Sequence, residues 1–347
     1  MAVTSSASER PPREKLARKR GNEMSEKVAP VRWGFIGAGM IAKKALYPAL
    51  QNSEWGEIYA VAGKDAQRAK ALSPSGRFYT DYQEIIDDPN VEAIYISLPN
   101  SLHIPWSIKA MEAGKDVLCE KPLAMNAQEV REATKVARDT GRLFMEASWN
   151  RWHPRTKRLA EIVHSGEIGA IEKIKTCFTY DGLPDENIRA FPELGGGGLY
   201  DLGPYSVAAP LWLMNFAPTE ITKAEVAWHH MGSDETVRIE FTVGKVKAEA
   251  ITSMNVPSTL YFEVFGSAGA VVMGGNDAFN SHNKSSTLEI YGKHGKRTEE
   301  FAACDPYQLM ADDFSKKVRG RSDCWIMSLD ESLIFAEFFD SVFEKLL

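Results

Sequence analysis

Between residues 31 and 147, short apolar runs alternate with segments whose apolar residues recur every three or four positions. A short apolar run bounded by glycine is typical of a buried strand, and the longer spacing is typical of a helix packed on one face. Strands that alternate with helices predict right-handed crossover units and a parallel sheet. The expected strands cover residues 31–36, 58–62, 93–98, 116–119 and 143–147, and the expected helices cover a segment ending at residue 50 and residues 65–72, 82–86, 101–113 and 126–140.

The pattern changes after about residue 150. A helical segment at 155–164 precedes β-rich runs that have no helices between them, and Gly244-Lys245 joins two of these runs as a tight hairpin turn. Consecutive strands of this kind predict a large, mostly antiparallel sheet, so we expect an α/β protein with domains at residues 30–150 and 151–347. The expected strands cover residues 171–180, 224–228, 237–243, 246–253 and 260–265, and helices return at 307–318 and 329–346.

Length and composition agree with two globular domains, since 347 residues correspond to two domains at about 150 residues each. The net charge of −6 argues against a nucleic-acid or anionic-membrane partner. No apolar run approaches the ~18 residues that span a bilayer. The four cysteines are scattered without a C-x-x-C pair, which predicts a reduced, cytoplasmic protein without disulfides or a zinc site. These features fit an enzyme best.

The first residues differ from the rest. Residues 1–23 carry six basic and three acidic residues, with almost no large apolar side chain. We expect a disordered basic tail over residues 1–29. A secretory signal is disfavoured because no apolar segment follows the basic one. A nucleic-acid arm or another targeting peptide stays open, and an extension ahead of a start at Met24 is the favoured interpretation.

A glycine turn joins the first expected strand to the first expected helix. It reads Gly37-Ala-Gly39-Met-Ile-Ala42, the G-x-G-x-x-A pattern in the position that dinucleotide-binding Rossmann domains require. Gly37 allows the tight turn, and Gly39 lets the backbone approach a pyrophosphate. The amides at Met40 and Ile41, where the helix begins, would bind its phosphates. A purely structural turn is the alternative.

The end of the second strand favours NADP over NAD. An NAD site usually carries an acidic residue there, but this sequence reads Gly63-Lys64-Asp65. Gly63 occupies the acidic position, and Lys64 is placed to meet a 2′-phosphate. Asp65 is better explained as the cap of the next helix. A solvated surface lysine is the alternative for Lys64, so NAD stays possible.

Three further sequence motifs occur along the chain in the same order as in a known family. They are residues 99–103, the E-K-P sequence at 120–122, and a glycine run that continues into 195–205. Together with the glycine turn, they resemble the glucose–fructose oxidoreductase/inositol dehydrogenase (Gfo/Idh/MocA) family over roughly residues 30–347. The resemblance implies a Rossmann domain followed by an α/β domain with an open sheet, which binds substrate and mediates dimerisation. A homodimer or homotetramer is therefore expected.

The resemblance also assigns residues. It implies that Lys121 contacts the substrate hydroxyl and the nicotinamide, and that Asp201 and Tyr205 complete the catalytic set. Tyrosine at 205 is similar to the subgroup of dihydrodiol dehydrogenase, NADP-dependent xylose dehydrogenase and nucleotide-keto-sugar reductases. The resemblance further implies Pro99, Asn100, His103 and Glu120 on the cofactor side, and Trp149, Arg151 and Trp152 on the substrate side.

Proton transfer explains these residue types independently. Oxidising an alcohol removes a proton from its hydroxyl, and free Tyr and Lys titrate near ~10, too high for a base at neutral pH. An ammonium beside Tyr205 favours its phenolate, and burial disfavours the Lys121 ammonium, so the two are expected to tune each other. Asp201 precedes Tyr205 by four residues, which places both on one face of a helix.

Several of these residues have an alternative role in packing. Tyr205 could be a core aromatic, and His103 could be a packed, hydrogen-bonded histidine. Trp149 and Trp152 could belong to the core or could stack on a substrate ring. We expect no metal site at His229-His230, because adjacent residues of a strand point to opposite faces.

The sequence thus predicts an NADP-preferring dehydrogenase or reductase that acts on a sugar, polyol or cyclic dihydrodiol. One alternative is a reductase of nucleotide-linked keto-sugars. Another is a non-catalytic, dinucleotide-sensing regulator of the same fold. Lys121, Asp201 and Tyr205 favour an enzyme, since a sensor needs no proton relay.

Overall fold

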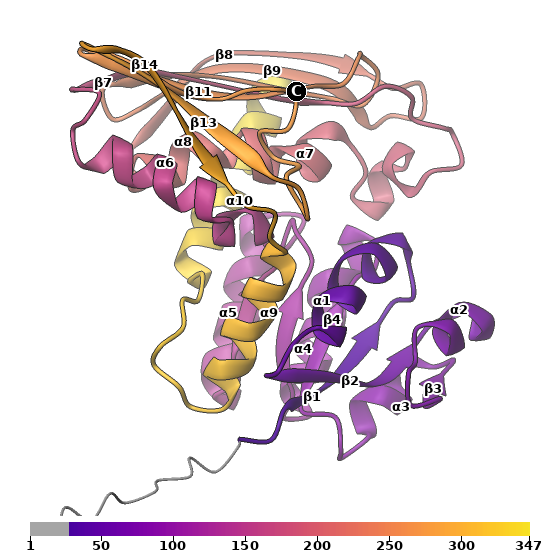
Figure 1. The fold of residues 1–347 in the computed structure, drawn as a ribbon. Coiled ribbons are helices and arrows are strands. Elements are labelled where there is room, and N and C mark those ends of the chain that lie inside the picture. The colour runs from indigo at the N-terminus through magenta and orange to yellow at the C-terminus, as the bar shows by residue number, and fades with distance from the viewer. Residues whose placement is uncertain (1–27) are drawn as a thin grey trace, which may run out of the picture.

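The structure is a computed structural model that describes residues 28–347 (Figure 1). Residues 1–27, and with them nearly all of the expected basic tail, lie outside the described residues. The first half forms a six-stranded parallel sheet in the order β3-β2-β1-β4-β5-β6, which confirms the predicted parallel sheet. Its strands are β1 (Val31–Ile36), β2 (Gly56–Ala62), β3 (Phe78–Tyr79), β4 (Ala93–Ile96), β5 (Asp116–Cys119) and β6 (Phe144–Glu146).

Helices connect these strands, and local capping explains where several begin. Asp65 caps α2, and Asn126 caps α5, which ends at Gly141 with a positive φ of 65°. The segment after β1 begins at Met40 and includes a π-helical turn. The bounds are η1 (Ala42–Leu46), α1 (Tyr47–Gln51), α2 (Ala66–Ala71), α3 (Tyr82–Asp87), η2 (Asn100–Leu102), α4 (His103–Glu112) and α5 (Ala127–Thr140).

Burial on both faces explains why the first strands read as continuous apolar runs. All four residues of β4 are buried. On one face Tyr95 packs edge-on against Phe35, with ring centroids 5.1 Å apart. On the other face Ile94 and Ile96 lie in a second hydrophobic cluster with Ile36. A parallel sheet covered on both sides needs apolar side chains at successive positions rather than at alternate ones.

The second half contains an eight-stranded sheet in the order β14-β13-β12-β11-β7-β10-β9-β8. Its pairs are antiparallel except β7 with β10, which confirms the predicted mostly antiparallel sheet. The turn between β9 and β10 contains Gly244 at φ 60°, as expected for the hairpin. The strands are β7 (Ile171–Thr179), β8 (Thr219–Trp228), β9 (Asp234–Val243), β10 (Val246–Ser253), β11 (Thr259–Gly266), β12 (Gly269–Met273), β13 (Ser286–Gly292) and β14 (Gly295–Phe301).

Helices cover one face of this second sheet. Figure 1 shows α6, α7, α8 and α10 between the eight-stranded sheet and the first half, and no helix of residues 28–347 on the other face. The last two helices return to the first half, where Trp33 Nε1 donates to Ser315 Oγ (3.1 Å) and Ala127 N donates to Asp340 Oδ2 (2.9 Å). The bounds are η3 (Trp149–Trp152), α6 (Pro154–His164), η4 (Ile188–Ala190), η5 (Pro192–Leu194), α7 (Gly198–Ser206), α8 (Ala208–Leu213), α9 (Pro306–Val318) and α10 (Leu329–Leu346).

The four cysteines are free thiols, as the sequence predicted, and Cys119 and Cys177 are buried. Burial raises the pKa of the Cys177 thiol to about 11, which keeps it protonated at neutral pH. Within residues 28–347, none of the helices has both the length and the apolarity to cross a bilayer.

Candidate active site

A cavity of about 630 Å³ extends from the carboxyl ends of β1 and β4 to the start of α7. Ligands of doubly wound sheets bind at this edge, because the strand order reverses there and leaves a crevice. The structure therefore brings together motifs that are far apart in the sequence. Lining the cavity are all the residues that the sequence assigned to the cofactor or to proton transfer: Gly37, Gly39, Met40, Ile41, Lys64, Pro99, Asn100, His103, Glu120, Lys121, Asp201 and Tyr205.

The glycine turn has the geometry that a pyrophosphate needs. Gly37 has a φ of 104°, and a Cβ added there would lie 2.7 Å from the Ser97 carbonyl oxygen. At Gly39 the nearest atom to such a Cβ is 3.9 Å away, so the backbone is open to a ligand. Lys43 N donates to Gly39 O as the helix begins, so the preceding amides lack intrahelical acceptors. A dinucleotide fits this turn.

Met40 and Ile41 support the same fit. Both apolar side chains line the cavity and are 62% and 37% exposed. Exposed apolar side chains at the mouth of a cavity are often covered when a ligand binds, because burying their surface is favourable. The beginning of this helix therefore offers amides to phosphates and apolar contacts to the rest of a dinucleotide.

Two cationic side chains, those of Lys64 and Arg68, lie beyond the carboxyl end of β2. Asp65 caps α2 as predicted, with its Oδ1 accepting from Gln67 N (2.9 Å) and Arg68 N (3.1 Å). Lys64 and Arg68 are both exposed and line the cavity. This is where the ribose next to the adenine lies in such folds. Lys64 was predicted from the sequence and Arg68 was not, although the position of Arg68 in the first turn after Lys64 was a usable signal.

Asn100 joins the first half to the glycine run, because its Nδ2 donates to Gly195 O (2.7 Å). His103 is fully buried, with one ring nitrogen 2.8 Å from Pro122 O and the other 2.9 Å from Leu98 O. Burial lowers the pKa of His103 to about 4, so the ring is neutral and donates to one of these carbonyls. His103 thus packs two cavity-lining segments together, which matches the alternative interpretation.

Glu120 lies at the end of β5 and is buried. Its Oε1 accepts from the Tyr95 hydroxyl (2.6 Å), and its Oε2 accepts from the Lys121 amide (3.3 Å). Burial raises the pKa of Glu120 above its usual value, although the Lys121 charge opposes this. The carboxyl group therefore fixes the turn that places Lys121 in the cavity.

Lys121, Asp201 and Tyr205 meet at the inner end of the cavity. Lys121 Nζ donates to Asp201 O (2.7 Å) and to Asp201 Oδ1 (3.2 Å), and it lies 4.9 Å from the centroid of the Tyr205 ring. The lysine comes from the first half, and the other two come from one face of α7, as their four-residue spacing predicted. The second oxygen of Asp201 lies 2.7 Å from Arg189 Nε.

The charges of this group follow from burial and from one another. Burial would raise the pKa of Asp201, but Lys121 and Arg189 outweigh it and lower the pKa to about 2. Burial would lower the pKa of Lys121, but Tyr205, Asp201 and Glu120 raise it above its usual value. The carboxylate is therefore ionised and the lysine is an ammonium at neutral pH.

The pKa values of Tyr205 and Lys121 differ in part from what the sequence predicted. Burial raises the pKa of Tyr205 above its usual value, and the Lys121 ammonium, which lowers it, does not outweigh burial. The expected effect of the Lys121 ammonium, which favours the phenolate, is present but smaller than that of burial. The expectation that burial would disfavour the Lys121 ammonium overall is not met, because Tyr205, Asp201 and Glu120 together raise its pKa.

Trp149 does not line the cavity. It is 5% exposed, its Nε1 donates to the Tyr205 hydroxyl oxygen (2.8 Å), and its ring stacks on Tyr307 with centroids 4.7 Å apart. Trp149 therefore contacts Tyr205, which lines the cavity, and does not reach the cavity itself as we expected. Of the two interpretations of Trp149, the core is the one that the structure favours.

Arg151 and Trp152 also lie away from the cavity, contrary to their expected substrate contacts. Arg151 pairs with Glu331 (3.2 Å) and stacks over the Trp325 ring at 5.0 Å. Trp152 is fully buried, and its Nε1 donates to Asp313 Oδ2 (3.0 Å). Both side chains hold the last part of the chain against η3. Adjacent aromatic and cationic residues serve such packing as readily as substrate binding, so the sequence did not distinguish the two roles.

Four residues that were not assigned individual roles from the sequence line the inner end of the cavity: Phe178, Tyr180, Ile188 and Arg189. The last two belong to the loop 181–189, which the sequence did indicate as part of the substrate pocket. Tyr180 donates to Asp201 Oδ2 at 3.5 Å, and Arg189 pairs with the same oxygen. The backbone of Arg189 is held by Gly197, whose amide donates to its carbonyl (2.9 Å). The only signal in the sequence was the polar loop between β7 and the glycine run, whose path depends on the tertiary structure.

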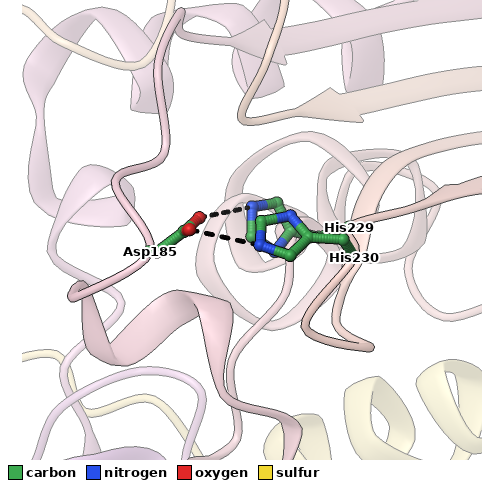
Figure 2. Close-up of side chains that lie close together, drawn as sticks. All are labelled: Asp185, His229 and His230. Atoms are coloured by element: carbon green, nitrogen blue, oxygen red, sulfur yellow. Dashed lines mark hydrogen bonds and ion pairs between the residues drawn. The ribbon is translucent and has the colours of Figure 1, made fainter.

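His229 and His230 also differ from expectation. Strand β8 ends at Trp228, so both histidines lie in a turn, and their rings face the same carboxylate, that of Asp185 (Figure 2). The ring centroids are 4.3 Å apart. The argument from alternating strand faces was therefore wrong, because the strand does not continue through these residues.

Family models match both halves of the chain. Residues 31–148 match the model described as "Oxidoreductase family, NAD-binding Rossmann fold", and residues 156–272 match the "GFO/IDH/MocA C-terminal domain". The first match covers the glycine turn and the E-K-P segment, and the second covers the glycine run with Asp201 and Tyr205.

Individual relatives are similar to this chain over most of its length. A D-xylose 1-dehydrogenase (NADP(+)) of Haloferax volcanii is 31% identical over 321 residues, which is 90% of this chain and 96% of the relative. A trans-1,2-dihydrobenzene-1,2-diol dehydrogenase of Mus musculus is 34% identical over 239 residues, 67% of this chain and 71% of that protein. The crystal structure of a 3-ketoreductase from Actinomadura kijaniata, in complex with NADP and TDP-benzene, superposes with a TM-score of 0.85 at 27% identity, covering 91% of this chain and 98% of that one.

Proposed function

Because the chain belongs to the Gfo/Idh/MocA oxidoreductase family, as its motifs indicated, we propose that it is an NADP-preferring enzyme that interconverts CH–OH and carbonyl groups. We propose a sugar, polyol or cyclic dihydrodiol as substrate. The meeting of Lys121, Asp201 and Tyr205 in the cavity that begins at the glycine turn is the observation that carries this proposal. A dinucleotide sensor would need the turn but not the proton-transfer group.

The cofactor would lie along the length of the cavity. The glycine turn and the amides after it would hold the pyrophosphate, and Lys64 with Arg68 would hold a 2′-phosphate. Asn100 would lie beside the nicotinamide, close to Lys121. When bound, the nicotinamide supplies the hydride acceptor or donor, while the protein supplies binding, orientation and the proton.

Tyr205 is the proposed proton donor and acceptor. Burial keeps its phenol protonated in the free site, so in the reduction direction its O–H can donate to the substrate carbonyl oxygen. Trp149 Nε1 and the Lys121 ammonium both favour the phenolate that this transfer leaves. In the oxidation direction the phenolate takes the proton back from the substrate hydroxyl.

Asp201 and Arg189 keep Lys121 in place. The Asp201 carboxylate lies between the Lys121 ammonium and the Arg189 guanidinium, so it fixes the ammonium without removing its charge. Lys121 is therefore proposed as a fixed positive charge near the reacting oxygen, and not as the base. Phe178 and Ile188 would contact the C–H surfaces of the substrate.

A nucleotide-linked keto-sugar is the second candidate substrate. The match to a 3-ketoreductase with TDP-benzene over 91% of this chain favours it. We also propose that copies of the chain associate through the face of the eight-stranded sheet that no described helix covers, as a homodimer or homotetramer (Figure 1). The free thiols suit the proposed cytoplasmic location.

A cofactor-coupled screen tests the proposal. The protein is incubated with NADP⁺ or NAD⁺ and aldoses, polyols, inositols or dihydrodiols, and with NADPH and keto-sugars, including nucleotide-linked ones. We expect turnover with members of one substrate class and a lower KM for NADP⁺ than for NAD⁺. Tight NADPH binding without turnover of any compound would instead favour the sensor.

A further inference from the structure

The Asp185, His229 and His230 side chains converge outside the cavity (Figure 2). Nε2 of His229 lies 3.6 Å from Asp185 Oδ1, and Nε2 of His230 lies 3.2 Å from Oδ2. One donor atom from each residue lies within 4.8 Å of the others. We propose that this group, the Asp185–His229–His230 cluster, binds a divalent transition-metal ion such as Zn²⁺.

The spacing of the donor atoms suits such an ion. Zinc bonds of about 2.0–2.2 Å in a tetrahedral arrangement place two donor atoms about 3.3 Å apart. The two nitrogen–oxygen separations in the cluster, each measured to a different oxygen of Asp185, lie on either side of this value. One donor atom from each of the three residues lies within 4.8 Å of the others, so small side-chain movements would bring the three to this spacing. Two imidazoles and one carboxylate select zinc, copper or nickel over magnesium and calcium, which prefer oxygen ligands. Three protein ligands leave the fourth position to water.

Ion binding requires one change in His229. Its Nδ1 accepts from the Met231 amide (3.2 Å), so the neutral ring carries its proton on Nε2, the atom that faces Asp185. Binding through Nε2 transfers that proton to Nδ1, with no net proton release, and breaks the Met231 bond. The Met231 amide is in an exposed turn, where water can replace the lost acceptor. The tautomer of His229 therefore reports on the ion.

The cluster connects two segments that are far apart in the sequence. Asp185 is in the loop after β7, and the histidines follow β8. The same loop carries Arg189, which pairs with Asp201 in the cavity. An ion would fix the loop to the second sheet and so hold Arg189 against Asp201. This consequence rests on the proposed function, whereas ion binding itself does not.

Calorimetric titration of the full chain with ZnCl₂ tests the site without any assay of activity. We expect one ion per chain, and we expect His230→Gln and Asp185→Asn each to weaken binding by about tenfold or more. Both side chains are more than half exposed, so these variants should fold. His294→Gln removes an exposed histidine outside the cluster and should bind as the unchanged protein does.

Two further measurements locate the ion and test its consequence. Nitrogen NMR of the imidazoles should show the His229 proton moving from Nε2 to Nδ1 when Zn²⁺ is added, and amide exchange in residues 181–191 should slow. The absence of saturable binding, or equal affinity in His230→Gln, Asp185→Asn and the unchanged protein, would overturn the site. Unchanged exchange in 181–191 with zinc bound would overturn the link to the loop.

Discussion

In the proposed mechanism, Lys121 contributes charge to the site rather than a proton. Because Asp201 holds its ammonium beside the Tyr205 ring, Lys121→Met removes the positive charge that favours the phenolate. We expect turnover to fall at least about a hundredfold, the usual size of an acid–base contribution, with NADPH affinity nearly unchanged. Steady-state kinetics and a fluorescence titration with NADPH measure the two effects. Lys135→Met, at an exposed position on α5, is the control, and undiminished turnover in Lys121→Met would refute the proposed role of the Lys121 charge.

The Tyr205 hydroxyl and the Trp149 indole can be tested as a pair. Tyr205→Phe should lower turnover at least about a hundredfold, because it removes the transferred proton.

Trp149→Phe keeps an aromatic ring against Tyr307 but removes the Nε1 donor. Since that donation favours the phenolate, its loss should raise the pKa of Tyr205 and move the pH profile of alcohol oxidation upward. A Trp149→Phe variant with an unshifted profile would limit Trp149 to packing.

We propose that Lys64 and Arg68 together determine the preference for NADPH over NADH. Lys64→Ala and Arg68→Ala should each raise the KM for NADPH by about tenfold or more, since a charge-assisted bond to a phosphate is worth about 1.5–3 kcal/mol. The KM for NADH should hardly change, because NADH has no 2′-phosphate. Lys70→Ala, an exposed lysine on α2 that does not line the cavity, is the matched control. Equal effects on the two cofactors would refute the assignment.

Helix α7 carries both Asp201 and Tyr205, so the site depends on how this helix begins. Asp234 Oδ2 accepts from Leu199 N (2.6 Å), which caps the helix from strand β9. Asp234→Ala should lower the free energy of unfolding by about 1–3 kcal/mol and reduce turnover, because the first turn loses its acceptor. Asp234→Asn keeps an acceptor oxygen and should lose less. Urea unfolding and kcat measure both, and an unchanged kcat in Asp234→Ala would show that α7 holds its position without the cap.

The same helix shows which elements the sequence could predict. Strands such as β1 and β5 were predicted with their observed bounds, because buried parallel strands consist of continuous apolar residues. A helix through Asp201 and Tyr205 was expected from their spacing, but the bounds of α7 were not predicted, since Gly198, Gly203 and Pro204 are poor helix formers and packing has to stabilise it. Strand β14 was missed because its residues are mostly exposed and charged, so no apolar alternation marks it. Strands β12 and β13 and helix α8 were also not predicted, although α8 is fully buried and the two strands are partly so, which means that burial alone does not make an element recognisable in the sequence.

The candidate site joins distant parts of the chain, and this limited its prediction. The cavity-lining motifs could be recognised singly, since the glycine turn and the E-K-P segment each have a local pattern. The role of Trp149 could not, because its position beneath Tyr205 depends on Tyr307 from α9. Arg189 likewise reaches Asp201 only because the loop after β7 folds back over α7. Residues whose function depends on such contacts have no signal in their own neighbourhood of the sequence.

We expect the contact between β6 and α10 to make the stability of the whole molecule depend on pH. Glu146 on β6 is buried and accepts from Ser332 Oγ on α10 (2.6 Å). Burial raises its pKa to about 7, above the value of about 4.3 for a free glutamate. The folded protein therefore binds this proton more tightly than the unfolded chain. Its contribution to stability is fully present below about pH 4.3 and is lost as the pH rises through 7.

We therefore expect the free energy of unfolding to fall between pH 5 and pH 7, by up to about 1.4 kcal/mol per pH unit for each such group. Glu146→Gln should flatten this slope, because a neutral amide can still accept from Ser332. Asp234, whose pKa burial also raises to about 7, should leave a smaller slope in that variant. Urea unfolding at pH 5, 6, 7 and 8 measures the profiles, with Glu337→Gln on the exposed side of α10 as the control. Parallel profiles for Glu146→Gln and the unchanged protein would mean that Glu146 titrates alike in both states, and that the contact between the two halves does not depend on its proton.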